Sequence, residues 1–475
     1  MKLSQMLKNA DVKSGYSDVE ISFVTDRPEK CVKNSAFVCI EGFSFDGHGS
    51  IDEAEKNGAV VFITQKDTGR KNQIIVENTR KTYALMCSRF FSEPSKSMKL
   101  IGITGTNGKT TTAHTIYGLL TLSGRKAGLI GTAENIIDGN REESDFTTPG
   151  AFEFNRALRK MADCGTEYCV CEVSSQALDQ YRTYPCEFEV GVFTNISNEH
   201  LDYHHTFENY LSAKKKLFSQ CKSAVINLDD SAAEEIISSC GCEIMTFSTR
   251  DDRSDITAKD IRYYDGYTEY AAVMFSEICR VKVRGIGEYS VRNSLAAIAV
   301  MLKLGFKLSE AAEKAALISP VAGRGEKLKT NTDYSVIVDY AHNPDALYNI
   351  LSALSNLKKG KIITLFGCGG ERDREKRADM GNIAGAFSDI AVITDDNPRN
   401  ENEDEIINDI LSGMKESKCR IYVEKDRAQA IRLALMNAEK DDIVLLAGKG
   451  SEAYQTVKNE KIPFSDREKA EEILS

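Results

Sequence analysis

Residues 99–112, KLIGITGTNGKTTT, combine residue types that could hold a polyphosphate. A short apolar run enters a turn that contains Gly105 and Gly108, and Lys109 and Thr110 then open a predicted helix. Glycines let successive backbone N–H groups turn toward one anion, and the helix N-terminus adds a partial positive charge. A lysine here can reach the β- and γ-phosphates of a nucleotide, and the following hydroxyl can ligate Mg²⁺. The stretch predicts a nucleotide-binding loop.

The glycine spacing of this loop differs from the standard pattern G-x-x-x-x-G-K-[ST], because Ile103 stands where the first glycine is expected. An ordinary strand–turn–helix corner with an exposed lysine is the alternative. We favour nucleotide binding because two glycines, a lysine and a threonine occur together in a strand-to-helix context.

Further polar residues follow two predicted strands, Tyr168–Val173 and Val190–Thr194. The first brings Glu172 and Ser174, and the second continues into NISNEHLDYHH, which presents Asn195, Glu199, His200, Asp202 and His204. Open α/β sheets bind ligands at the carboxyl ends of their strands, and a carboxylate with an imidazole near a triphosphate suits Mg²⁺. A single histidine could be structural. Four of the six histidines follow predicted strands, however, and this clustering favours a site: His200, His204, His205 and His342.

Composition limits the class of protein. At 475 residues the chain is long enough for roughly three domains. A net charge of −10 argues against general affinity for nucleic acid or anionic membranes, so an anionic substrate would need local clusters of Arg and Lys. The thirteen scattered cysteines are an odd number without C-x-x-C spacing, which predicts reduced thiols in the cytoplasm and no structural zinc. No window predicts a membrane span, and the N-terminus lacks the apolar core of a signal peptide.

The predicted elements fall into three segments. Residues 1–96 carry four short strands and a helix at Ile51–Asn57, followed by a helical Lys81–Phe91 and a linker at Glu93–Ser95. From Lys99 to about Pro320, strands alternate with helices, which predicts βαβ units in a mainly parallel sheet, with β-hairpin material at 255–284. After Gly323 a second alternation begins, with strands at Ser335–Asp339, Lys361–Gly367, Ile390–Asp395, Ile421–Glu424 and Ile443–Ala447.

Nine motifs in order along the chain resemble those of the Mur ligases, ATP-dependent amide-forming enzymes of peptidoglycan synthesis. They are TGTNGKTTT (104–112), TTPG (147–150), EVSSQALDQYR (172–182), TNISNEHLDYH (194–204), GEYSVRNSLAA (287–297), VDYAHNPDAL (338–347), GCGGERD (367–373), DDNPR (395–399) and AGKGSEAYQ (447–455). The resemblance implies a small α/β UDP-sugar-binding domain (1–96), a central P-loop-type ATPase domain with a parallel sheet (97–321) and a C-terminal Rossmann-like, amino-acid-binding domain (322–475).

The resemblance also implies roles in binding ATP and Mg²⁺. The phosphate loop would be Gly105, Thr106, Asn107, Gly108, Lys109, Thr110 and Thr111. Asn293 would contact adenine, Asp339 the ribose and Arg324 the γ-phosphate. The metal ligands would be Thr110, Glu172, His200 and Lys214, and the catalytic residues Lys109, Lys214, His200 and Arg324.

Lys214 has two interpretations. In ENYLSAKKKLF (208–218) the family pattern places a carbamylated lysine, an anion able to hold a second Mg²⁺, at this position. From the residues alone, a solvated basic helix face is favoured. The resemblance makes the modification the stronger hypothesis.

The substrate residues are implied in the same way. Thr147, Thr148, Ser174, Gln180 and Arg182 match positions that hold a UDP-muramoyl dipeptide, and loop 41–49 with Thr25–Arg27 resembles a uridine site. Arg182 suits a pyrophosphate or carboxylate. The amino-acid pocket would contain Arg372, Asp396, Asn397, Pro398, Arg399, Gly448 and Glu452.

The DNPR pattern favours meso-diaminopimelate as the added amino acid. Its second carboxylate can accept two hydrogen bonds from the Arg399 guanidinium, whereas lysine has no such group. An Asn-Pro turn with an exposed arginine is the alternative. We expect a monomeric cytoplasmic ligase without nucleic-acid partners.

Several positions depart from the family pattern, and other functions stay open. The departures are Phe146, His205, Ala378 and Ser451, which put the shape of the substrate pocket in doubt but remove no phosphate or metal group. A related ligase that adds L-lysine or another amino acid, a ligase acting on folate or another peptide, and a P-loop ATPase or nucleotide-binding module that forms no bond are the alternatives. Retention of Glu172, His200, Lys214 and Arg324 counts against the last.

Overall fold

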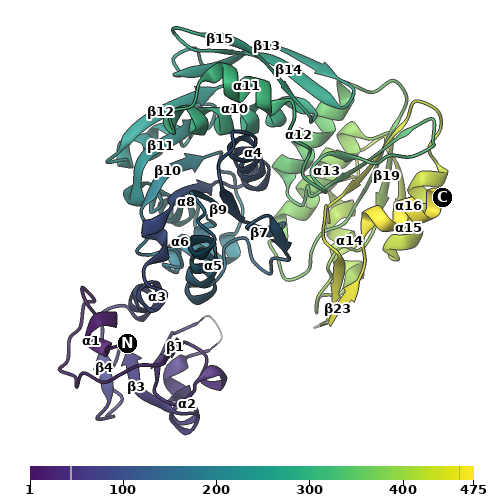
Figure 1. Cartoon of the computed structure of the whole chain (residues 1–475). Helices are drawn as coiled ribbons and strands as arrows, with labels where there is room; N and C mark the ends of the chain where they lie inside the picture. The colour runs from purple at the N-terminus through teal and green to yellow at the C-terminus, as the bar shows by residue number, and fades with distance from the viewer. Residues whose placement is uncertain (43–44, 459) are drawn as a thin grey trace.

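The computed structural model describes residues 1–42, 45–458 and 460–475, which form three α/β domains in chain order (Figure 1). The N-terminal domain has a parallel sheet in the order β1 (Phe23–Thr25), β2 (Ser35–Val38), β3 (Ala59–Thr64) and β4 (Gln73–Ile75). Apolar residues of α1 (Leu3–Met6) and α3 (Thr79–Phe90) pack on one face, and those of α2 (Ile51–Lys56) on the other. The 3₁₀ helices η1 (Pro28–Lys30) and η2 (Gly47–Ser50) lie in its loops.

The central domain contains a sheet of eleven strands in the order β15-β14-β13-β12-β11-β10-β5-β9-β6-β7-β8. Strands β13 to β6 in this order are parallel, and antiparallel strands flank them at both edges. The strands are β5 (Lys99–Thr104), β6 (Ala127–Ile130), β7 (Asn135–Ile137), β8 (Asn140–Glu142), β9 (Tyr168–Glu172), β10 (Phe188–Phe193), β11 (Cys221–Asn227), β12 (Glu243–Ser248), β13 (Ile256–Tyr264), β14 (Tyr267–Val273) and β15 (Ile278–Val283). The predicted mainly parallel sheet and the hairpin material at 255–284 are confirmed.

Helices cover both faces of this sheet because its strands are apolar on both sides. One face packs against α4 (Lys109–Leu122), α10 (Gly287–Lys303) and α11 (Leu308–Ala315). The other packs against α5 (Ala151–Asp163), α6 (Ser175–Asp179), α8 (Phe207–Lys215) and α9 (Ala233–Ser239). The short helices η3 (Pro94–Ser97), α7 (Leu201–His204) and η4 (Phe218–Gln220) complete the domain.

The C-terminal domain has a sheet in the order β16-β17-β21-β18-β19-β20, parallel except for the edge strand β16. Its strands are β16 (Glu326–Lys327), β17 (Ser335–Asp339), β18 (Ile362–Phe366), β19 (Ile390–Ile393), β20 (Arg420–Val423) and β21 (Ile443–Ala447). Helices α12 (Pro344–Ser355), α13 (Glu375–Phe387) and α14 (Glu403–Ser412) cover one face, and α15 (Arg427–Met436) and α16 (Asp466–Leu474) the other. A separate hairpin pairs β22 (Tyr454–Val457) with β23 (Glu460–Pro463).

The predicted strands of all three sheets are present, whereas β6, β7, β8, β12, β16 and the hairpin β22–β23 were not predicted. All thirteen cysteines are free thiols. In the part of the chain that the structure describes, no helix combines the length and apolarity needed to cross a membrane.

Candidate active site

The loop between β5 and α4 is shaped by two glycines with positive φ, Gly105 at 152° and Gly108 at 85°. A Cβ at Gly105 would overlap the side chain of Thr194, and one at Gly108 the side chain of Asn293. These close approaches require glycine at both positions. The loop is fixed from the end of β10, because Thr194 Oγ1 donates to the carbonyl of Asn107 at 2.7 Å.

Lys109 closes the loop on itself. Its ammonium donates to the carbonyl oxygens of Gly105 and Thr106, both at 2.9 Å. Burial lowers the pKa of Lys109, and the carboxylates of Glu172 and Glu199 act in the opposite direction. A phosphate arriving in this loop would therefore meet a cation that has no anionic partner within hydrogen-bonding distance among the described residues.

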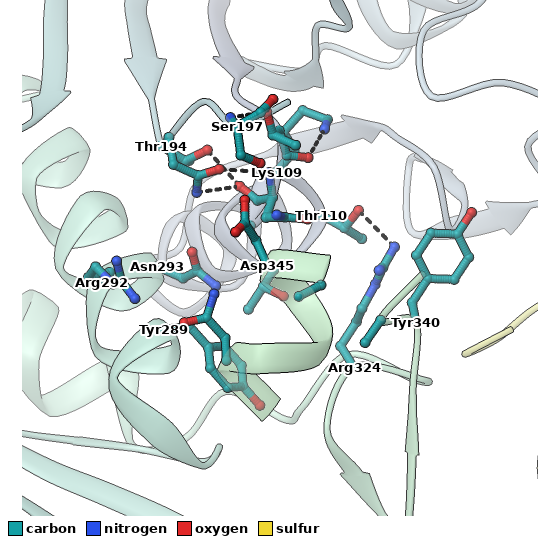
Figure 2. Close-up of a pocket in the computed structure, with 18 of the residues that line it drawn as sticks. Lys109, Thr110, Thr194, Ser197, Tyr289, Arg292, Asn293, Arg324, Tyr340 and Asp345 are labelled. Carbon is teal, nitrogen blue, oxygen red and sulfur yellow. Dashed lines mark hydrogen bonds between the residues drawn. The ribbon is translucent and has the colours of Figure 1, made fainter. Parts of the chain in front are cut away.

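Glu172, at the end of β9, is fully buried beside the start of α4. Its carboxylate accepts hydrogen bonds from Thr110 Oγ1 at 3.0 Å, from Thr132 Oγ1 at 2.9 Å and from the Thr132 N–H at 2.8 Å. Arg324 Nη2 donates to Thr110 Oγ1 at 3.4 Å from the C-terminal domain (Figure 2). A hydroxyl and a carboxylate that meet at the head of a phosphate loop form the hard oxygen set that Mg²⁺ prefers. The residues present fit the predicted Thr110–Glu172 metal site.

Thr132 is a residue that the sequence analysis missed. It follows β6, which pairs with β9 in parallel register, so this residue lies beside Glu172. Its hydroxyl is within 3.0 Å of Thr147 Oγ1 as well. No motif marks this threonine, and only the strand order could have identified it.

Glu199 and His200 lie where the central and C-terminal domains meet. Glu199 is buried and accepts hydrogen bonds from His342 Nε2 at 3.1 Å and Asn343 Nδ2 at 3.3 Å. Burial favours a raised pKa for Glu199, but the hydrogen bond and charge of His342 and the charges of His200 and Lys109 hold it well below its usual range. Burial lowers the pKa of His200 to about 4, which makes it a neutral imidazole available as a ligand.

Lys214 lies on α8 and is 1% exposed. Its ammonium lies 4.3 Å from the centre of the Tyr210 ring, and no carboxylate of the described residues forms an ion pair with it. Burial, together with the charge of Lys109, lowers its pKa well below the usual value. The solvated-face interpretation is therefore wrong, and the neutral amine required for carbamylation is favoured at this position.

A cavity of about 410 Å³ is lined by all of the predicted nucleotide residues except Gly105. Thr106 to Thr111 line it at one end, and Asn293, Arg324 and Asp339 line it elsewhere. Two backbone N–H groups, of Gly325 and Ala341, donate to the Asp339 carboxylate at 2.6 and 2.8 Å, and burial raises its pKa to about 6. The apolar and aromatic lining residues Phe247, Tyr289, Ala346 and Ile350, and the polar Arg292, Asp345 and Asn349, were not predicted (Figure 2 shows part of this set).

A second cavity, of about 710 Å³, adjoins the first. The two share a wall formed by Lys109, Thr132, Thr147, Glu199, His200, Arg324, Tyr340 and His342. Of the predicted substrate residues, Thr147, Thr148, Ser174, Arg182, Arg372, Asp396, Asn397, Arg399, Gly448 and Glu452 line this second cavity. Gln180 and Pro398 do not line it. Gly105, Glu172 and Lys214, which were predicted for other roles, line neither cavity.

Arg182 is held in place by neutral groups. Its Nη1 donates to the Thr148 carbonyl at 2.8 Å, and its Nη2 donates to Gln180 Oε1 at 2.9 Å. Thr148 Oγ1 in turn accepts from the Ser174 N–H at 3.0 Å. Gln180 therefore orients Arg182 instead of lining the cavity.

Residues of the DNPR segment line the same cavity. Arg399 Nη1 donates to the Gly370 carbonyl at 2.6 Å, and burial and the charge of Arg372 lower the pKa of Arg399. Asn397 Nδ2 donates to Glu452 Oε2 at 3.1 Å. The fully buried Lys449, which was not predicted, donates to the same oxygen at 3.0 Å. One oxygen of Asp396 is buried without a hydrogen-bond partner among the described residues.

The predicted uridine region belongs to the N-terminal domain and lines neither cavity. Within it, Thr25 Oγ1 accepts from the Arg27 N–H at 3.0 Å, and Asp46 accepts from the His48 N–H at 3.0 Å. Residues 43 and 44 of the predicted loop lie outside the described residues.

Most cations of the second cavity form no direct ion pair with a described residue, although carboxylates such as Glu199, Asp396 and Glu452 line the same cavity. In the described parts of the chain, six of the lysines and arginines that line it form no ion pair: Lys109, Arg182, Arg324, Arg372, Lys376 and Arg399. Among the described residues, Lys461 is the one lysine or arginine of this lining with an ion pair, to Asp145 at 3.8 Å. In a chain of net charge −10, unpaired cations gathered in one cavity indicate an anionic ligand.

Three family models match the chain in order. They are described as the Mur ligase family catalytic domain (residues 20–89), the Mur ligase middle domain (103–301) and the Mur ligase glutamate ligase domain (323–450).

Individual proteins match over the whole chain. UDP-N-acetylmuramoyl-L-alanyl-D-glutamate–2,6-diaminopimelate ligase 2 of Clostridium acetobutylicum is 40% identical, with 100% of both chains covered. A solved structure of a UDP-N-acetylmuramoyl-L-alanyl-D-glutamate–2,6-diaminopimelate ligase is 28% identical, with a TM-score of 0.73, and 100% of this chain and 98% of that chain are covered. The MurF ligase of Thermotoga maritima in complex with ADP shares the fold, with 22% identity, a TM-score of 0.63 and 95% and 96% of the two chains covered.

Proposed function

The chain belongs to the Mur ligase family of ATP-dependent amide-forming enzymes, and we propose which bond it makes. We propose that it joins meso-diaminopimelate to the D-glutamate of UDP-N-acetylmuramoyl-L-alanyl-D-glutamate in peptidoglycan precursor synthesis. The relatives that match its full length carry this activity in their names.

The observation that carries the proposal is the wall shared by the two cavities. Lys109 and Arg324 face both the nucleotide side and the substrate side. A γ-phosphate bound by these cations would lie next to a carboxylate bound in the second cavity. Its transfer to that carboxylate gives an acyl phosphate, which the incoming amine attacks and from which phosphate departs. Holding the two reactants in adjacent cavities supplies catalysis by position and by charge neutralisation.

The residues of the phosphate loop and those around it have distinct parts in this scheme. Lys109 and the loop N–H groups bind the phosphates, and Arg324 neutralises the charge that develops on the transferred group. Thr110, Glu172, His200 and Lys214 would hold Mg²⁺, which when bound screens the crowded phosphate and carboxylate oxygens. Lys214 would act as its carbamate, since an uncharged buried amine is the form that adds carbon dioxide.

The amino-acid side supports diaminopimelate over lysine. Arg399 and Arg372 flank Gly369 and have no carboxylate partner in the described residues, so a second carboxylate on the amino acid would supply one. Glu452, Asn397 and Asp396 offer acceptor oxygens for the ammonium group beside it. A partly buried arginine such as Arg399 disfavours an analogue without that carboxylate, because its guanidinium then stays unpaired.

The test is phosphate release with ATP, Mg²⁺ and the UDP-dipeptide in the presence of either meso-diaminopimelate or L-lysine. We expect release that depends on the amine and strongly prefers diaminopimelate, and Arg399→Ala should abolish the preference. Equal activity with both amines, or release independent of any amine, would refute the proposal. The second outcome would identify a nucleotide hydrolase, and failure to bind any UDP-sugar would favour a ligase for another substrate.

Four further features stay proposals. We propose domain boundaries at 96/97 and 321/322, uridine binding by the N-terminal domain, a monomer in solution, and a cytoplasmic location. The free state of all thirteen cysteines supports the last of these.

A further inference from the structure

A buried ion pair lies behind the amino-acid pocket and belongs to none of the roles described above. Arg377 on α13 is fully buried and makes a two-pronged contact with Glu401: Nη1 donates to Oε1 and Nη2 to Oε2, both at 2.7 Å. Arg377 Nη1 also donates to Asp409 on α14 at 2.9 Å. A guanidinium fixed by two carboxylates in this way is a rigid anchor.

Glu401 extends this anchor to the loop that carries Arg372. Its Oε2 accepts the N–H of Glu371 at 2.9 Å, and Glu371 directly precedes Arg372. Glu401 itself follows the DNPR segment, and its own N–H donates to the Pro398 carbonyl at 3.1 Å. One residue therefore contacts both loops from which the pocket's arginines project, the Glu371 loop through its carboxylate and the DNPR segment through its backbone N–H.

Both loops need such support. Glu371 and Arg399 have left-handed backbone conformations, with φ of 53° and 54°, which non-glycine residues hold only when their surroundings impose them. The two guanidiniums, of Arg372 and Arg399, also repel one another, since the charge of Arg372 helps to lower the pKa of Arg399. Further bonds join the loops, from Arg399 Nη1 to the Gly370 carbonyl at 2.6 Å and from the Gly370 N–H to the Asn397 carbonyl at 3.0 Å.

We propose that Glu401, anchored by Arg377, is a positioning residue that sets the spacing of Arg372 and Arg399 and so the preference for an amino acid with a second carboxylate. This inference rests on the proposed function. Glu401 acts through the backbone of its neighbours and touches no substrate. Its loss should weaken binding of a dicarboxylic amino acid and leave the nucleotide side unchanged.

The test compares Glu401→Gln with Asp409→Asn. Both substitutions remove one negative charge from beside Arg377 and Arg374, but of the two residues only Glu401 accepts the backbone N–H of Glu371. We expect Glu401→Gln to raise the KM for meso-diaminopimelate by about tenfold, with kcat and the KM for ATP within about twofold of wild type. Activity with L-lysine should change little. Asp409→Asn should lower the thermal unfolding midpoint similarly and leave the KM for meso-diaminopimelate unchanged.

A third variant and the wild type separate the possible failures. Arg377→Lys keeps the positive charge but loses the two-pronged contact with Glu401, so we expect a smaller rise in the KM for meso-diaminopimelate. This variant also tests the proposal if Glu401→Gln does not fold. Equal KM changes in Glu401→Gln and Asp409→Asn, or no change in either, would overturn the positioning role while wild-type selectivity stands. A wild-type enzyme without preference for diaminopimelate would overturn the proposed function and this inference with it.

Discussion

One methyl group added at Gly131 should displace the buried carboxylate of Glu172. Gly131 follows β6, and its backbone φ lies outside the left-handed region, so alanine is tolerated conformationally. A Cβ built there overlaps Glu172 Oε1. The carboxylate would have to move away, and it would then lose contacts with Thr110 and Thr132.

The size of the effect follows from these contacts. Glu172 accepts three hydrogen bonds at 2.8, 2.9 and 3.0 Å, and hydrogen bonds to a charged group are worth about 1.5–3 kcal/mol each. Overpacking of this kind costs about 1–3 kcal/mol of stability. A misplacement of about 1 Å at a catalytic centre costs on the order of 100-fold in rate, so we expect Gly131→Ala to lower kcat by that factor.

Gly128→Ala is the matched control, because it adds the same methyl group three residues earlier, on β6. Its Cβ meets the flexible end of Met161, which can shift, and lies 3.2 Å from the Ile136 carbonyl oxygen; neither group contacts Glu172. Both variants gain equally from a less flexible unfolded chain. Initial rates of ADP formation and urea unfolding curves are measured for both. A kcat for Gly131→Ala within about threefold of wild type, or an equal loss in Gly128→Ala, would refute the reasoning.

Three other perturbations have defined outcomes. Asp466→Ala should cost about 3–5 kcal/mol in urea unfolding, because it leaves the fully buried Arg427 without its carboxylate, whereas Glu471→Ala removes only an exposed pair and should cost less than about 1 kcal/mol. The hydrogen bond from Arg377 is the main cause that lowers the pKa of Glu401 from 4.5 to about 2. The ionised Glu401 carboxylate therefore stabilises the fold fully above pH 4.5 and progressively less as the pH falls toward 2. The stability difference between wild type and Glu401→Gln should therefore shrink over that range, and a constant difference would contradict the assignment. Labelled bicarbonate should give a carbamate ¹³C signal that Lys214→Arg removes; the same signal in both proteins would exclude this lysine as the modified group.

The parts of the site that lie on local sequence could be predicted. The turn around Gly105 and Gly108, the lysine and threonine after it, and the residues at the ends of β9 and β10 are fixed by strand and turn patterns within a few residues. Parallel strands end at one edge of a sheet, so their terminal side chains converge there. The residues after β5 and β10 that line the nucleotide cavity could therefore be predicted from the sequence.

The parts that depend on contacts between distant segments could not be predicted. Thr132 acts through the pairing of β6 with β9, and Asn343 reaches the loop at Asn107 from another domain, with 3.1 Å between its Nδ2 and Asn107 Oδ1. The hairpins β7–β8 and β22–β23 were not predicted for another reason. Strand β8 is exposed along its whole length and β23 likewise, so neither shows the apolar alternation that reveals a strand.

Several hydrogen bonds between the central and C-terminal domains are made by groups that would also bind ligands. Arg324 donates to Thr110, and His342 and Asn343 donate to Glu199, all from the C-terminal domain to the central domain. A γ-phosphate that recruits Arg324, or a metal that recruits Thr110, must take these groups from their present partners. Ligand binding therefore competes with the hydrogen bonds that hold the two domains in their present arrangement. Because a ligand shifts an arrangement only by its differential affinity, the nucleotide and the substrate carboxylate must together favour whichever arrangement brings Lys109 and Arg324 to the same phosphate.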